Sequence, residues 1–249
     1  MSHLLKDKIC LVTGASKGIG KAIVERFVQE GAIVYANARS IDAVKDWATE
    51  LNKTSEGSVK PIIFDITDEK AVKEAVQKIK KEQGRLDVLV NNAAISYNES
   101  IGMISSQHLR EILEVNVVAL TSLLQLAARV MSRQQSGSII NISSLVGICG
   151  NPGQLSYAAS KGAVIALTKS AAKELAPKNI RVNSVAPGLT DTEMFRQVDQ
   201  KALESRISNI GMGRLAKPVE IADTCIYLAS DLSTYVSGQV ISVDGNTII

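Results

Sequence analysis

The chain of 249 residues has 45% hydrophobic and 21% charged residues and a formal net charge of +3. A chain of this length and composition is expected to form one large globular domain, here covering residues 1–249. Because the charge excess is small and scattered, we expect no nucleic-acid partner and no membrane partner. Cys10, Cys149 and Cys225 lie far apart in a sequence with 2 histidines. We therefore expect reduced thiols, no metal site and a cytoplasmic protein.

Short β-branched segments alternate with longer amphipathic segments along the chain. In order, the pattern predicts a strand at 9–13, a helix at 19–29, a strand at 33–38, a helix at 41–51, a strand at 58–64, a helix at 71–81 and a strand at 86–90. It continues with a helix at 109–131, a strand at 138–142, a helix at 156–175, a strand at 181–185, a helix at 220–229 and a strand at 239–243. Because the strands are apolar on both faces, we predict an α/β doubly wound Rossmann fold, with helices on both faces of a mostly parallel seven-stranded sheet. Residues 96–105 and 189–212 are expected to form loops beside the substrate.

A glycine-rich turn follows the first predicted strand. Gly14, Gly18 and Gly20 have the spacing GxxxGxG and lead directly into a predicted helix. Glycines allow a sharp turn and a close approach of the backbone to a pyrophosphate, and the N-terminus of a helix attracts negative charge. The turn is therefore a candidate nucleotide site. A tight β–α turn without a ligand has the same pattern, so the spacing alone is weak evidence.

The end of the second predicted strand bears on the choice of nucleotide. NAD sites usually carry an Asp or Glu there, which binds the ribose 2′-OH. This chain instead has Arg39 followed by Ser40, and Lys17 lies in the glycine turn. Two cations would bind a 2′-phosphate, so we predict NADP (NADPH) rather than NAD. The alternative is that Arg39 is a solvated loop residue.

Tyr157 and Lys161 form a candidate catalytic pair. They are four residues apart in a predicted helix, so their side chains lie on one face. Free tyrosine titrates at a pKa of about 10, and a nearby ammonium group favours the phenolate. The pair therefore predicts a proton donor beside a fixed cation, with the tyrosine pKa drawn toward neutral pH.

Several motifs occur in a fixed order along nearly the whole chain: the three glycines of the first turn, Asn91-Asn92-Ala93-Ala94, Ser144, Tyr157-x-x-x-Lys161 and Pro187-Gly188. Together they resemble the short-chain dehydrogenase/reductase family. Residues 150–154, 214–218 and 243–245 are most similar to those of bacterial 3-oxoacyl-[acyl-carrier-protein] reductases. The resemblance implies an NAD(P)-dependent oxidoreductase acting on CH–OH groups.

The resemblance also implies a role for each matching residue. Tyr157 would give a proton to a substrate carbonyl, Lys161 would hold the nicotinamide ribose, and Ser144 would hydrogen-bond the same carbonyl. Asn116 would hold a water that connects Lys161 to solvent, and Ser143 is the weaker alternative to Ser144. The implied substrate contacts are Ser144, Gln154 and Tyr157, and the implied cofactor contacts are Gly14, Ser16, Lys17, Gly18, Ile19, Gly20, Arg39, Ser40, Asp65, Ile66, Asn91, Ala93, Tyr157, Lys161, Pro187, Gly188, Thr190 and Thr192. For Asp65 the alternative is a turn residue that caps a helix.

The implied reaction is reduction of a 3-oxoacyl thioester, carried on acyl carrier protein, by NADPH. Residues 96–104 keep little of the loop typical of these reductases, so a sugar, polyol or steroid substrate is an alternative. A nucleotide-binding protein without catalysis is a further alternative, because fold alone does not define function. In the family, the helices around 116–131 and 156–175 pair between subunits, so a homotetramer is expected.

Overall fold

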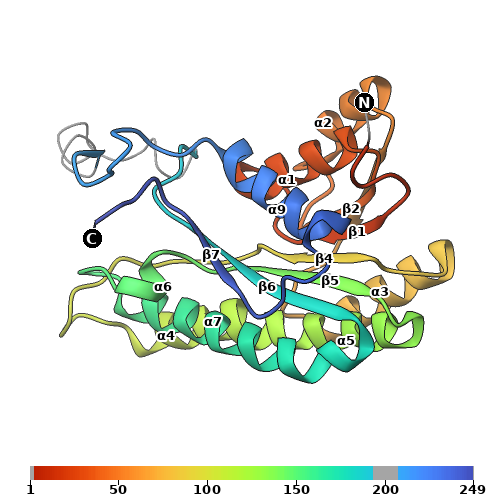
Figure 1. The fold of residues 1–249 in the computed structure, drawn as a ribbon. Coiled ribbons are helices and arrows are strands. Elements are labelled where there is room, and N and C mark those ends of the chain that lie inside the picture. The colour runs from red at the N-terminus through yellow and green to blue at the C-terminus, as the bar shows by residue number, and fades with distance from the viewer. Residues whose placement is uncertain (1–2, 193–206, 249) are drawn as a thin grey trace.

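The structure, a computed structural model, describes residues 3–192 and 207–248. Seven strands pair in parallel in the order β3-β2-β1-β4-β5-β6-β7 (Figure 1). The strand order reverses between β1 and β4, which is where ligands bind in doubly wound sheets. The strands are β1 (Ile9–Val12), β2 (Ile33–Ala38), β3 (Ser58–Ile63), β4 (Val88–Asn91), β5 (Gly137–Ile142), β6 (Ile180–Pro187) and β7 (Val240–Val243).

Helices cover both faces of this sheet, with α1 and α9 on one face and α3, α5 and α7 on the other (Figure 1). Successive strand residues therefore enter different cores: Val12 packs with the α1 side, and Leu11 packs with the α3 side. Both faces are buried, which explains why the strands are continuously apolar. The α-helices are α1 (Gly18–Gln29), α2 (Lys45–Thr54), α3 (Glu69–Gln83), α4 (Ser106–Leu113), α5 (Leu120–Gln134), α6 (Val146–Cys149), α7 (Leu155–Leu175) and α9 (Pro218–Ala229). The other helical segments are η1 (Glu114–Ala119), η2 (Ala176–Lys178) and η3 (Asp231–Ser233).

The predicted fold class is confirmed, and most predicted elements lie within two residues of the observed ones. The helix predicted at 41–51 is an exception, because α2 begins at Lys45. Val44, the residue before it, has φ −129° and ψ −32°, so the chain first makes a separate turn closed on the carbonyl of Ile41. The prediction also missed α6, which has 4 residues and is too short to show a helical period.

The long helix predicted at 109–131 is three segments. Between α4 and α5 the chain forms a π-helical segment, η1, which contains Asn116. One extra residue per turn shifts the faces of the helix on either side, and such segments are frequent at functional sites. The whole helical stretch Ser106–Gln134 is long and apolar enough to cross a membrane by length and composition. Its buried residues, among them Leu123 and Met131, pack in the core beside β4 and β5, and this packing accounts for its apolarity.

Candidate active site

The glycine turn after β1 lies directly against the segment that follows β4. A Cβ atom on Gly14, which has φ +63°, would lie 2.8 Å from the Cα of Ala93. A Cβ on Gly20 would lie 2.2 Å from the carbonyl oxygen of Gly14. Neither position admits a side chain, so the close approach itself requires both glycines. The turn delivers the N-terminus of α1, with its positive dipole end, to the carboxyl edge of the sheet.

Thr13 and Asn92 fix this contact by hydrogen bonds. The Thr13 hydroxyl oxygen accepts from the backbone N–H groups of Asn92 and Ala93 at 3.0 and 3.1 Å. The amide Nδ2 of Asn92 donates to the carbonyls of Thr13 and Gly14 at 3.0 and 3.1 Å. Neither Thr13 nor Asn92 is among the site residues predicted from the sequence. Both residues lie in motifs that the sequence shows: Thr13 immediately precedes the first glycine of the turn, and Asn92 is part of Asn91-Asn92-Ala93-Ala94.

The residues predicted to contact the adenosine end lie around this edge. Ile66, Asn91 and Ala93 line one small cavity together with Thr13, Ala119, Leu120 and Leu123. The side chain of Asn91 does not face a ligand: it is buried and donates to Asn141 Oδ1 at 2.9 Å. Asn141 in turn donates to Thr168 on α7 at 2.9 Å. Asn91 therefore links β4 to β5 through its side chain and, through Asn141, to Thr168 on α7.

Arg39 and Asp65 lie close together at the ends of β2 and β3. Asp65 Oδ1 accepts hydrogen bonds from the backbone N–H and the hydroxyl of Thr67, at 2.9 and 2.7 Å. These bonds lower the pKa of Asp65, and the Arg39 guanidinium lowers it further. One oxygen of Asp65 thus orders the turn before α3, but Asp65 does not cap the helix, because the N-cap is Asp68, which accepts from the Ala71 N–H at 3.0 Å. Arg39 is exposed beside it.

The loop after β6 closes the other side of the edge. The N–H of Gly188 donates to Val243 on β7 at 3.0 Å, and a Cβ on Gly188 would lie 2.7 Å from the Cα of Asp244. The Thr190 hydroxyl donates to the Gly188 carbonyl at 3.1 Å. Thr192 is the nearest residue to a Cβ built on Gly18, at 3.4 Å. This loop therefore returns to the glycine turn as predicted, and residues 193–206 of the predicted substrate loop lie outside the described residues.

Ser144, Tyr157 and Lys161 are brought together at the ends of β5 and α7. Ser144 hydrogen-bonds the Tyr157 hydroxyl, whereas burial raises the pKa of Tyr157. The Nζ of Lys161 lies 5.7 Å from the centroid of the Tyr157 ring. Ser143 is excluded from this group, because its buried hydroxyl donates to the carbonyl of Val185 at 3.1 Å. The geometry thus selects Ser144 over Ser143.

Comparison with known proteins agrees with this arrangement. The profile of the family described as "Enoyl-(Acyl carrier protein) reductase" matches residues 14–246. The chain is 45% identical to the 3-oxoacyl-[acyl-carrier-protein] reductase FabG of Thermotoga maritima over 98% of this chain and 99% of that protein. The chain belongs to the short-chain dehydrogenase/reductase family. It is accordingly an oxidoreductase that acts on CH–OH groups with a nicotinamide cofactor.

Two further proteins are similar to this chain over nearly its whole length. A 3alpha-hydroxysteroid dehydrogenase of Mediterraneibacter gnavus is 39% identical over 98% of each chain. The crystal structure of a 3-oxoacyl-[acyl-carrier protein] reductase from Brucella melitensis superimposes with a TM-score of 0.93 and 32% sequence identity, over 99% of this chain and 93% of that one. Short-chain dehydrogenases of similar sequence and fold therefore act on different substrates.

The residues present fit a nicotinamide dinucleotide. The backbone cradle at Gly14 and Gly20 leaves no room for a Cβ, and Lys17 precedes the first turn of α1 without a side-chain capping bond. The N–H groups of that turn therefore point toward the edge where a pyrophosphate would lie. Lys161, at the far end of the same edge, supplies a buried cation.

Lys161 has an unusual environment for an ammonium group. It is 3% exposed, and its Nζ donates to the Ile142 carbonyl at 2.8 Å. Burial lowers its pKa to about 8. The expectation that Lys161 draws the Tyr157 pKa down is not met by the chain's own groups, because burial raises the pKa of Tyr157 and the Ser144 hydrogen bond offsets only part of that effect. Desolvation dominates here because the two groups share the same buried region.

Asn116 links the catalytic helix to the loop after β4. It is 1% exposed, and its Nδ2 donates to the Ile95 carbonyl and to the Ser160 hydroxyl at 2.9 and 3.0 Å. Its Oδ1 accepts from the Ile95 N–H at 2.9 Å. Both amide hydrogens of Asn116 are therefore used by protein groups. Its predicted role with a water near Lys161 stays a prediction.

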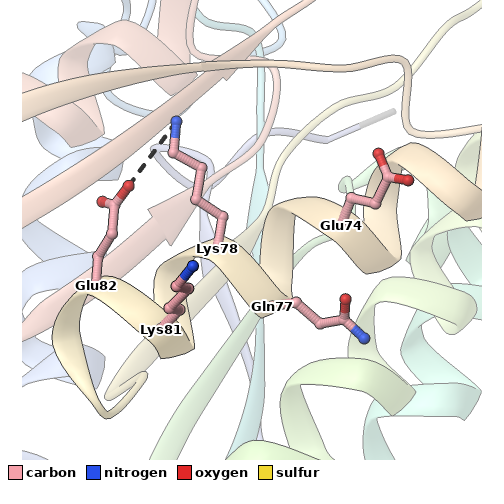
Figure 2. Close-up of a pocket in the computed structure, with 5 residues that line it drawn as sticks. All are labelled: Glu74, Gln77, Lys78, Lys81 and Glu82. Atoms are coloured by element: carbon pink, nitrogen blue, oxygen red, sulfur yellow. Dashed lines mark ion pairs between the residues drawn. The ribbon is translucent and has the colours of Figure 1, made fainter.

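The hollow on α3 does not belong to this site. Figure 2 shows its lining, which comes from one helix: Glu74, Gln77, Lys78, Lys81 and Glu82. All five side chains are exposed, and Lys78 pairs with Glu82 at 3.9 Å. Exposed pairs of this kind contribute little and define no binding geometry. We assign no site to this surface.

The lowered pKa of Lys161 predicts a pH-dependent cofactor affinity. Below about pH 8 the ammonium is charged and can bind the cofactor, whereas above its pKa of about 8 it loses that charge. We expect cofactor affinity, measured by fluorescence titration between about pH 6.5 and 9.5, to fall as pH rises through this value. Lys161→Arg keeps its charge over that range and is expected to show no such fall. A flat wild-type profile would contradict the assignment.

Proposed function

We propose that this enzyme reduces a 3-oxoacyl thioester, carried on acyl carrier protein, to the 3-hydroxyacyl thioester with NADPH. The observation that carries the proposal is the position of Tyr157, whose ring centroid lies 5.7 Å from the Nζ of the buried Lys161, which donates to the Ile142 carbonyl at 2.8 Å. The names of several relatives supply the substrate class, including the FabG protein that is 45% identical. The hydroxyl groups of Ser144 and Tyr157 can both donate hydrogen bonds to one carbonyl oxygen, and such bonds stabilise the negative charge that develops there during reduction.

In this mechanism the cofactor supplies the hydride that reaches the carbonyl carbon. Ser144 donates a hydrogen bond to the carbonyl oxygen, and this bond becomes stronger as negative charge develops on that oxygen. Tyr157 then transfers its phenolic proton to the same oxygen, so that the alcohol forms and a phenolate remains. Because burial raises its pKa, Tyr157 is a neutral phenol at neutral pH and holds its proton until negative charge develops on the substrate oxygen. The Lys161 cation stabilises the phenolate that follows.

A steroid ketone or alcohol is the second candidate substrate. The observation in its favour is the 39% identical hydroxysteroid dehydrogenase, which covers the chain as fully as the reductases do. The catalytic geometry serves both substrates, because the reacting group of each is one ketone or the corresponding secondary alcohol. The two candidates therefore differ only in what surrounds the reacting carbon.

The preference for NADPH is proposed from Arg39 and Lys17. Arg39 is exposed at the end of β2, and Lys17 immediately precedes α1, so both cations lie near the expected adenosine ribose. A guanidinium binds a phosphate in a bidentate manner that a hydroxyl does not match. Asp65 lies close enough to Arg39 for the guanidinium to lower its pKa, so the carboxylate offsets part of the positive charge of Arg39.

We further propose that the protein is a cytoplasmic homotetramer. Val118 is 45% exposed in η1, within the segment around 116–131 that the resemblance to the family places between subunits. Exposed apolar side chains on such a helix favour association. Light scattering of the intact chain is expected to give four times the chain mass, and a stable monomer would remove the proposal.

A direct assay tests the function. Acetoacetyl thioester is expected to oxidise NADPH rapidly, followed as loss of absorbance, with a crotonyl thioester and a 3-oxosteroid run in parallel. Tyr157→Phe is the control and should lower kcat by about 10²–10⁴, the usual contribution of an acid catalyst. Turnover of the steroid alone would favour the second candidate, and turnover of the crotonyl thioester alone would indicate enoyl reduction.

The cofactor proposal has its own test. Arg39→Asp is expected to raise KM for NADPH by about tenfold or more, because a charge-assisted bond to the 2′-phosphate is replaced by repulsion. KM for NADH should fall or stay the same, so that the preference reverses. Lys53→Asp, at an exposed position near the end of α2, is the matched control. If Arg39→Asp kept the preference for NADPH over NADH, the cofactor proposal would be wrong and Arg39 would be a solvated loop residue.

A further inference from the structure

Residues 96–105, which we call the substrate loop, are ordered by side chains that do not belong to the catalytic group. The loop starts at Ile95, whose N–H and C=O are both bonded by Asn116 at 2.9 Å. The same Asn116 donates to Ser160, the neighbour of Lys161. The beginning of the loop is therefore fixed to the catalytic helix.

The next part of the loop is attached to α4. The rings of Tyr97 and His108 stack with centroids 4.0 Å apart and an interplanar angle of 16°. The Tyr97 hydroxyl donates to Glu111 Oε2 at 2.9 Å, and Gln107 donates to the other oxygen of Glu111 at 2.9 Å. Stacking and hydrogen bonding act on the same tyrosine, so its orientation is fixed from two directions.

Glu99 joins the three parts of this arrangement. Its Oε1 lies 2.8 Å from His108 Nδ1 and accepts from the Ser105 N–H at 3.2 Å, which closes the loop on itself. Its backbone N–H donates to the Gly153 carbonyl at 2.8 Å. Beside it, Gln154 Nε2 donates to Asn98 Oδ1 at 3.0 Å. One glutamate thus connects the end of the loop, α4 and the residues that lead into Tyr157.

The predicted substrate residue Gln154 takes part in the same network. Its Nε2 bonds the substrate loop, and its Oε1 accepts from Asn151 at 2.8 Å. Both ends of its amide are therefore engaged by protein groups. This arrangement is a finding that the sequence did not predict, and it makes Gln154 part of the wall around the site.

The Glu99 carboxylate is not placed for stability alone. Its side chain is 16% exposed, and its second oxygen, Oε2, is buried with no hydrogen-bond partner within residues 3–192 and 207–248. Burial of an acceptor without a donor is unfavourable, and such groups are rare unless they serve a function. The contacts of Oε1 with His108 and Ser105 account for the position of the Glu99 side chain.

We propose that Glu99 is a positioning residue whose carboxylate, through His108 and Ser105, holds the substrate loop in the conformation in which the Glu99 backbone N–H bonds the Gly153 carbonyl, as one wall of the substrate site. The identity of the substrate used below rests on the proposed function. The order of the substrate loop in this protein comes from a network of its own, with Glu99 at the point where the connections meet.

The kinetic test compares Glu99→Ala and Glu99→Gln. We expect Glu99→Ala to raise KM for acetoacetyl thioester about tenfold, with kcat and KM for NADPH within about threefold of wild type, because substrate placement and not chemistry is lost. Glu99→Gln keeps an oxygen that accepts from Ser105 and should stay within about threefold. Glu50→Ala, which removes an exposed carboxylate on α2, is the matched control.

A second measurement does not depend on turnover. Hydrogen exchange of the amides of Glu99 and Ser105 should become faster in Glu99→Ala and remain near wild type in Glu99→Gln, while the core strands stay protected. Unchanged exchange, a loss confined to kcat, or an unchanged KM in Glu99→Ala would each overturn the proposal. If wild-type enzyme does not reduce the thioester, the proposed function fails, whereas the exchange result still decides whether Glu99 holds the loop.

Discussion

The close approach of the glycine turn to the segment after β4 is the constraint on which the rest of the site depends. No Cβ fits at Gly14 or Gly20, since the nearest atoms would be 2.8 and 2.2 Å away. Because the contact is between backbones, it is held by the polar groups of Thr13 and Asn92 rather than by apolar packing. It sets where α1 begins, and with it the place at which a helix dipole meets a phosphate. A larger residue in the turn would displace the helix as well as the ligand.

A second constraint follows from burying Lys161. Removal of an ammonium from water is costly, and here the Nζ of Lys161 donates a hydrogen bond to the Ile142 carbonyl at 2.8 Å. The position of the lysine therefore depends on how firmly α7 is joined to the sheet. Two buried polar connections provide that joint: Asn116 to Ser160, and Asn91 through Asn141 to Thr168 on α7. Because fully satisfied buried networks favour one arrangement over others, these residues fix the geometry that the catalytic side chains need.

The sequence predicted the parts of this protein that follow from local pattern. Continuous apolar strands between amphipathic helices indicate a parallel sheet, and the glycine spacing locates the nucleotide edge. The π-helical segment at Asn116 left no such pattern, because one added residue per turn does not alter composition. The side chain of Asn91 turned inward, and the pKa of Tyr157 rose, for reasons that depend on what surrounds them in space. Burial is a property of the whole fold, so no single motif reports it.

Reaction and substrate are defined by different parts of the molecule. Ser144, Tyr157 and Lys161 lie at the ends of β5 and α7, where the packing of both cores holds them. The substrate loop is joined to α4 by the Tyr97–His108 ring stack and the Glu99–His108 contact, and to Gln154, just before α7, by a hydrogen bond. Polar surface contacts can be exchanged without disturbing a packed core. A family with this construction can therefore change its substrate while it keeps its chemistry, and the relatives of this chain, which include reductases of carrier-bound acyl groups and a steroid dehydrogenase, have that range.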